Sequence, residues 1–359
     1  VETQMYGNTL QIFIAMAVYI TAVISIGVHY AKRANESTEN YLLGGRQMGP
    51  WITAMGAEAS DMSGWLLMGL PGVAYFYGLS DAIWTAIGLL IGTYLNWLFV
   101  AKRIRSYSAI AGDSITIPEF LSNRFKEHRK IIMTIAALFI LIFFSVYAAS
   151  TFVTMGKLFS TLFGFKYQYM MLAGAAFVVT YTFIGGFLAE SASDFMQGVV
   201  MIFSLAFVLI AGVAAAGGAS AVIANAQQIP GFFEFFGIAT PKLVDGVQQV
   251  EGGKALFDAA APYGLLTIIS TMSWGLGYFG MPQVLLKFMA IRKISELTLS
   301  RRVATIWAAI AMFAAVAIGI IGRVLYPTQL LTSSDSENVF VLMSTNFFLP
   351  LIAGFVLAG

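Results

Sequence analysis

The sequence predicts an all-α membrane protein that crosses the bilayer several times. Of its 359 residues, 58% are hydrophobic and only 11% are charged, whereas about a quarter of the residues in a soluble domain are charged. The mean hydropathy is +0.80, and several runs of roughly 20 residues are almost free of charge, which is the length that crosses about 30 Å of hydrocarbon. The chain has no cysteine, which excludes disulfides and thiolate metal sites, and its net charge of +2 gives no sign of a nucleic-acid partner.

Eight apolar segments are expected to span the bilayer as helices, because an isolated span in lipid must satisfy its own backbone hydrogen bonds. These segments are residues 10–31, 49–78, 80–101, 131–162, 167–187, 193–216, 262–288 and 303–322. A ninth begins near residue 347 and has only about half the necessary length when the sequence ends. We therefore expect the natural protein to continue into further helices.

The placement of basic residues predicts the orientation. If successive connections alternate between the two sides, fourteen Lys and Arg residues fall on one side and five on the other. The basic side is expected to be cytoplasmic, which places the N-terminus outside. The long connection 217–261 then also lies outside, where its mixture of Gly, Pro and Phe predicts a partly ordered cap over an entrance.

The second span contains the stretch AEASDMSGWLLMGLPG, residues 57–72, in which two carboxylates interrupt an apolar helix. Glu58 and Asp61 are three residues apart and share a helix face, while nearby glycines and Pro71 weaken the helix. Ionisable side chains at this depth usually face an ion path, and a broken helix frees carbonyl oxygens for a cation. Oxygen ligands suit Na⁺ as a hard cation. We therefore expect Asp61 to line a transport pathway, the structural alternative being a kink with an acid near the interface.

The seventh span is interrupted in a similar way. Three glycines and Pro282 break the apolar sequence STMSWGLGYFGMPQVLLKFM, residues 270–289, and two interrupted helices in one chain point to the binding site of a transporter. Trp274 and Tyr278 are four residues apart, so they are expected to share a helix face. That face would enclose an apolar ring and attract a substrate ammonium. An aromatic belt at the membrane interface is the alternative.

Together these stretches resemble the sodium/solute symporter family. The matching stretches occur in the family's order and are YLLGGRQMGP (41–50), ASDMSGWLLMGLPG (59–72), FFSVYAAS (143–150), YTFIGGFLA (181–189) and WGLGYFG (274–280). The resemblance implies a LeuT-like five-plus-five inverted repeat with one extra N-terminal helix, truncated here in the second repeat. Within a single transporter domain, 1–359, it divides the chain into the extra helix and loop (1–48), the first repeat (49–216), the outer loop (217–261) and the start of the second repeat (262–359).

The resemblance also implies a function. It implies a secondary active transporter, not an enzyme, in the bacterial cytoplasmic membrane. Such a protein couples inward Na⁺ movement to uptake of a small solute, L-proline, by alternating access. The implied sodium-binding residues are Ala59, Asp61, Met62, Ser63 and Asp194, with Ala59 and Met62 using backbone carbonyls. The implied substrate-binding residues are Ser63, Gly64, Trp65, Tyr147, Trp274, Tyr278 and Pro282. Arg46 matches a basic residue that the family uses in coupling.

Some residues depart from the family pattern and leave alternatives open. Glu58 and Glu190 replace a glycine and a valine, and GMPQ, residues 280–283, replaces GQPH. The family's Ser/Thr pair for its conserved sodium site belongs to the helix that is cut short at residue 359. We group Glu58 with Arg46 as a coupling residue. Its side chain is compatible with three roles: a second cation ligand, a proton acceptor or a neutral buried carboxyl. Asp194 opens a span and also fits a helix N-cap.

Other functions differ in solute or in class. The same fold is compatible with transport of another amino acid, a sugar acid or a vitamin. It is also compatible with coupling to protons rather than to Na⁺. A transporter-like sensor is a further possibility. An intramembrane protease needs two aspartates that share a proton, but no G-x-G-D sequence precedes Asp61 or Asp194. No P-loop for ATP is present either. The sequence does not predict an oligomeric state.

Overall fold

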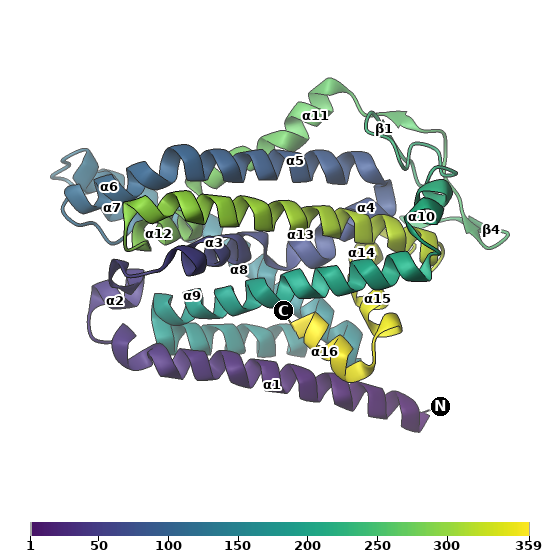
Figure 1. Cartoon of the computed structure of the whole chain (residues 1–359), viewed down its shortest axis with the longest axis horizontal. Coiled ribbons are helices and arrows are strands. Elements are labelled where there is room, and N and C mark those ends of the chain that lie inside the picture. The colour runs from purple at the N-terminus through teal and green to yellow at the C-terminus, as the bar shows by residue number, and fades with distance from the viewer. Residues whose placement is uncertain (1, 359) are drawn as a thin grey trace.

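The computed structural model describes residues 2–358 as a bundle of long helices that run roughly along one direction (Figure 1). Among the described residues, five helices are long and apolar enough to cross a membrane. They are Thr9–Ala34, Leu79–Ile110, Ile131–Phe163, Tyr167–Ala215 and Ile294–Leu325. The expected spans 49–78 and 262–288 are absent from this group because each is divided into shorter helices. The expected spans 167–187 and 193–216 lie within one long helix that bends sharply.

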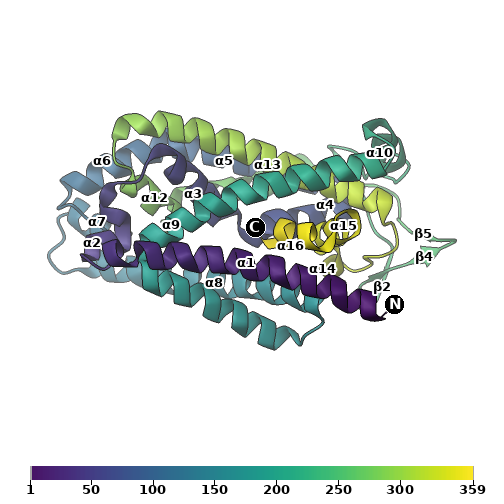
Figure 2. The ribbon, with the colours of Figure 1, turned by 60° about the horizontal axis from the view of Figure 1, so that its bottom comes forward.

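Residues 2–215 form α1 (Glu2–Ala34), α2 (Thr38–Leu43), η1 (Gly44–Arg46), α3 (Pro50–Gly64), η2 (Trp65–Gly69), α4 (Leu70–Tyr77), α5 (Leu79–Leu95), η3 (Asn96–Ala101), α6 (Lys102–Ile110), α7 (Ile117–Arg124), α8 (Ile131–Phe163) and α9 (Tyr167–Ala215). After α10 (Ala219–Ala226), the remaining helices are α11 (Leu265–Met272), η4 (Ser273–Gly280), α12 (Pro282–Ala290), η5 (Ile294–Glu296), α13 (Leu297–Leu325), α14 (Ser333–Ser336), α15 (Val339–Phe347) and α16 (Pro350–Ala358). The last of these, α16, packs on α1 (Figure 2), where Gly354 lies against Ala15.

The long helix α9 changes direction at Gly186. Its backbone angles there, φ 55° and ψ −154°, lie in a region that is open essentially to glycine alone. Side chains from both halves, Phe177 before the bend and Gln197 after it, line the same cavity. The two halves therefore lie side by side and correspond to two of the spans expected from the sequence.

The connection between α10 and α11 carries three short antiparallel strand pairs in addition to turns. They are β1 (Gly237–Ile238) with β6 (Ala261–Pro262), β2 (Leu243–Val244) with β3 (Val247–Gln248), and β4 (Val250–Glu251) with β5 (Lys254–Ala255). A buried arginine of α13, Arg323, holds this loop, since its Nη2 donates to Gln248 Oε1 at 2.6 Å and its guanidinium lies 4.7 Å from the Phe257 ring centroid. The expected cap is thus more ordered than the sequence suggested.

The two ends of the bundle differ in charge. The start of α1 and the strand pairs lie at one end, whereas α2, α6 and α7 lie at the other (Figure 1). The latter end includes the basic stretch that opens α6, Lys102 to Arg105. This separation agrees with the two-sided count of basic residues made from the sequence.

The helices differ in how far they are buried. In the most apolar window of α13, 67% of residues are buried inside the protein, against 0% for α8. Because lipid is as apolar as a protein core, an unburied apolar helix such as α8 is stable at the lipid boundary. Small residues allow the closest contacts: Gly88 and Gly92 on α5 meet the backbone of Met272 and Gly275 directly. This contact brings the interrupted segment η4 against α5.

Candidate functional site

The first interrupted helix breaks at Ser63. Its φ of 47° and ψ of −163° separate α3 from the π-helical segment η2, and non-glycine residues rarely adopt this conformation. The sequence predicted that the helix would break among the glycines and Pro71. The observed break is at a serine that directly precedes one of these glycines, Gly64. Met62 is buried in the core, and its carbonyl accepts the backbone N–H of Trp65.

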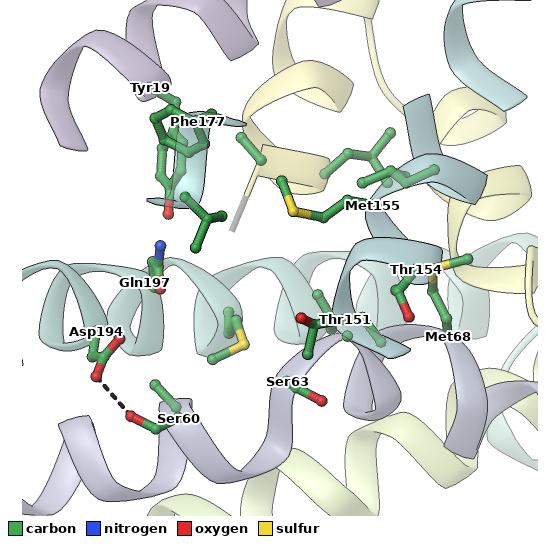
Figure 3. A pocket seen from close by; sticks show the side chains of 18 of the residues that line it. Tyr19, Ser60, Ser63, Met68, Thr151, Thr154, Met155, Phe177, Asp194 and Gln197 are labelled. Carbon is green, nitrogen blue, oxygen red and sulfur yellow. Dashed lines mark hydrogen bonds between the residues drawn. The ribbon is translucent and has the colours of Figure 1, made fainter. Parts of the chain in front are cut away.

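A cavity of about 480 Å³ lies beside this break, between α1, α3, α8 and α9. It is lined by several residues that the sequence singled out, namely Ala59, Ser63, Gly64, Tyr147 and Asp194, together with Ser60. Figure 3 shows Ser60, Ser63 and Asp194 around the same space. The Ser60 hydroxyl donates to Asp194 Oδ2 at 2.7 Å, and the Tyr147 hydroxyl donates to the Ser60 carbonyl at 3.1 Å. The cavity thus combines polar groups from α3, α8 and α9 in a largely apolar wall.

A buried lysine adjoins this cavity. The side chain of Lys287, on α12, is completely buried, and its Nζ donates to Glu190 Oε2 at 2.8 Å, Ser191 Oγ at 2.8 Å and Asp194 Oδ2 at 2.9 Å. Gly56 of α3 leaves room for it, because a Cβ at Gly56 would lie 3.4 Å from the ammonium. Asp194 is therefore an ion-pair partner rather than a helix cap.

Sequence reasoning assigned no role to Lys287. A lone lysine in an apolar helix is itself a signal, since an ionisable residue within the membrane is functional or paired by default. Its partners were not predictable, because Glu190 lies 97 residues away in the chain.

Asp61 faces a second, much smaller cavity. This cavity measures about 10 Å³ and is lined by Glu58, Asp61, Thr93, Asn96, Trp97, Tyr278 and Val284. None of these residues lines the large cavity. The structure therefore divides the expected sodium-binding set, with Ala59, Ser63 and Asp194 on the large cavity and Asp61 on the small one.

The second interrupted helix changes from α11 to the 3₁₀ segment η4 and restarts at Pro282, the first residue of α12. A 3₁₀ helix has three residues per turn, so positions four apart no longer share a face. Accordingly Tyr278 is 6% exposed and Trp274 is 52% exposed. The expectation that these two rings form one face was wrong for this reason. Trp274 instead packs edge-on against Trp65, with ring centroids 4.8 Å apart.

Arg46 lies apart from both cavities. Its Nη2 is 3.0 Å from Asp113 Oδ1 and donates to the Ser114 carbonyl at 2.8 Å, while Nη1 donates to the Ser108 hydroxyl and to the Met289 carbonyl at 3.2 Å. Met289 belongs to the same short helix as Lys287. Arg46 therefore ties the basic end of the bundle to the second half of the interrupted helix.

No cluster of three or more His, Cys, Asp or Glu residues suited to a metal ion occurs among residues 2–358. The available ligands are instead carboxylate pairs, hydroxyls, amides and backbone carbonyls, which are the ligands of hard cations. A membrane bundle with two interrupted helices beside buried carboxylates has the architecture of a secondary transporter.

Comparison with known proteins identifies the family. The family model described as "Sodium:solute symporter family" matches residues 41–359, and the chain belongs to this family, whose members are transporters rather than enzymes. The sodium/proline symporters of Staphylococcus aureus strains USA300 and JH9 are each 40% identical to it over 357 residues. That match covers 99% of this chain and 65% of each relative, so the chain spans about two thirds of the relatives' length.

A solved structure supports the fold. The match is to a Na⁺-coupled sialic acid symporter in a substrate-bound outward-open state, with a TM-score of 0.77 and 17% sequence identity. It covers 97% of this chain and 69% of the other. The likeness establishes the LeuT-like transporter fold.

Proposed function

We propose that the protein is a secondary active transporter that couples inward Na⁺ movement to uptake of L-proline by alternating access. The observation that carries this proposal is the cavity of about 480 Å³ at the break of α3, where a few polar groups lie in a largely apolar wall. Its volume is in the range of small-molecule sites. The names of the curated relatives, sodium/proline symporters at 40% identity, favour proline as the solute.

We infer that Na⁺ binds at the break itself. The ligands there are the backbone carbonyls of Ala59 and Met62 and the hydroxyl of Ser63, and Asp61 and Asp194 supply the nearest negative charges. A helix end at a midplane break offers free backbone oxygens to a cation. Lys287 neutralises part of the charge on Asp194, so an ion at Asp194 competes with this ammonium.

The best candidates for binding the solute are the residues that line the large cavity. Ser63, Gly64 and Tyr147 line it, while the Trp65–Trp274 pair, Tyr278 and Pro282 belong to the adjoining interrupted segments. We propose that these aromatic residues move toward the cavity during transport, and that Arg46 couples this movement to the basic end of the bundle. We further propose the five-plus-five repeat and an N-terminus outside a bacterial inner membrane.

The test is uptake of labelled L-proline into proteoliposomes that hold the natural protein containing this chain. We expect uptake when an inward Na⁺ gradient is present. Uptake is expected to fall to background when K⁺ replaces Na⁺, and to be lost in the Asp61→Asn variant. Asp258→Asn, on the exposed loop, is the matched control and is expected to transport normally. Uptake that does not depend on Na⁺ contradicts the coupling, and unlabelled competitors that displace proline more strongly than proline itself contradict the solute.

A further inference from the structure

The small cavity lies on a different face of α3 from the large one, and its volume of about 10 Å³ has room for one water molecule or one small ion. Oxygen-bearing side chains provide most of its wall, from α3, α5, η3 and η4. None of the described basic residues lines it, and the buried ammonium of Lys287 is engaged with Glu190 and Asp194. The cavity is therefore a polar, acidic space without an evident counterion.

Glu58 has one free oxygen in this cavity. The residue is 3% exposed, and its Oε1 accepts a hydrogen bond from Trp97 Nε1 at 3.3 Å. Its Oε2 is buried and has no hydrogen-bond partner. Within residues 2–358, neither Glu58 nor Asp61 forms an ion pair with Lys, Arg or His. Burying an ionised carboxylate without a partner is strongly unfavourable, so Glu58 is stable here with either a proton or a metal cation at its free oxygen.

Asn96 supplies a second free oxygen. It is 1% exposed, and its Nδ2 donates to the backbone carbonyl of Tyr278 at 2.8 Å. Because only the amide nitrogen can donate to a carbonyl, this bond fixes the amide orientation and leaves Oδ1 as an acceptor in the cavity wall. That Oδ1 is buried and has no partner. Asn96 also begins the π-helical segment η3, and such segments are frequent at functional sites.

We propose that this cavity binds a second Na⁺, held by the free oxygens of Glu58 and Asn96. Asp61 adds negative charge, and the hydroxyls of Thr93 and Tyr278 complete the shell. We favour Na⁺ over a proton because a proton on Glu58 is shared with a single acceptor, whereas one Na⁺ contacts both free oxygens, the Asp61 carboxylate and the hydroxyls at the same time. The inference rests on the proposed function, and it assigns Glu58 to ion binding directly.

The experiment measures equilibrium binding of ²²Na⁺ to the purified natural protein in detergent, without solute. Glu58→Gln keeps the size of the side chain and removes its charge, and Asn96→Leu removes the second free oxygen. Each is expected to lower the number of bound Na⁺ by one per protein, or to weaken one site at least tenfold. Glu337→Gln is the matched control, because Glu337 pairs with Lys157 away from this cavity, and it is expected to bind as the wild type does. If one variant does not fold, the other carries the test.

Different failures have different meanings. Unchanged ²²Na⁺ binding in Glu58→Gln and Asn96→Leu overturns the second site, whereas Na⁺-dependent uptake by the same proteins leaves the proposed function intact. If Na⁺ binding is unchanged but Glu58→Gln removes a proton that the wild type releases as the pH rises, the cavity holds a proton and the inference is wrong. A wild-type protein that binds no ²²Na⁺ contradicts both the second site and the proposed function.

Discussion

Replacing Lys287 tests the buried ion cluster most directly. In Lys287→Met the side-chain volume is nearly kept, but Asp194 loses its ammonium partner and retains the Ser60 hydroxyl as a donor. The ammonium makes three contacts of 2.8 to 2.9 Å and is fully buried. Breaking a buried ion pair by removing one partner costs about 3–5 kcal/mol, because a buried charge is left uncompensated.

Glu190→Gln provides the comparison. The side chain of Glu190 is 26% exposed and lines the large cavity, so its replacement is expected to cost less than removal of the fully buried ammonium. Its replacement also leaves Lys287 and Asp194 as a neutral pair. A double variant, Lys287→Met with Asp194→Asn, removes both charges of the buried pair, and such neutral replacements often restore stability.

The assay is thermal unfolding of the purified natural protein in detergent, followed by tryptophan fluorescence. At about 2 °C per kcal/mol for a protein of this size, Lys287→Met is expected to lower the midpoint by about 6–10 °C. Glu190→Gln is expected to change it little, and the double variant is expected to unfold closer to the wild type than Lys287→Met does. A midpoint for Lys287→Met equal to that of Glu190→Gln refutes the reasoning.

Three further predictions follow from the backbone and the outer loop. Ser63→Gly relieves a backbone conformation that costs about 1–3 kcal/mol for a non-glycine residue. The unfolding midpoint of this variant is therefore expected to rise, and a lower midpoint shows that the serine is not strained. Gly92→Ala brings a Cβ against the Gly275 carbonyl and is expected to cost about 1–3 kcal/mol, whereas Gly277→Ala, with no atom within 4 Å of the added Cβ, is its tolerated control in the same unfolding assay. Arg323→Leu removes the contacts that hold the outer loop and is expected to speed proteolysis within residues 243–257; an unchanged cleavage rate means that other contacts hold the loop.

The sequence predicted the membrane class, the transporter fold and the approximate place of both interruptions, because apolar length and Gly/Pro positions are local signals. Details that depend on distant residues were not accessible. The pairing of Lys287 with Glu190 joins segments far apart in the chain, and the free oxygen of Asn96 depends on a carbonyl 182 residues away. The aromatic pair was misjudged because the local helix type, 3₁₀ rather than α, changes which positions share a face.

The charges around α3 connect the two cavities and the interrupted helices in the mechanism that we propose. Four carboxylates line the two cavities, those of Glu58, Asp61, Glu190 and Asp194, and Lys287 is the one ammonium in ion pairs with them among the described residues. A surplus of buried negative charge in a membrane is costly unless cations accompany it. In the transport that we propose, bound Na⁺ offsets this surplus, and we expect the cation to enter before the solute. Lys287 lies on α12, so a cation that displaces it from Asp194 also weakens the attachment of the second interrupted helix. We therefore propose that ion binding and helix movement are linked through the Asp194 carboxylate.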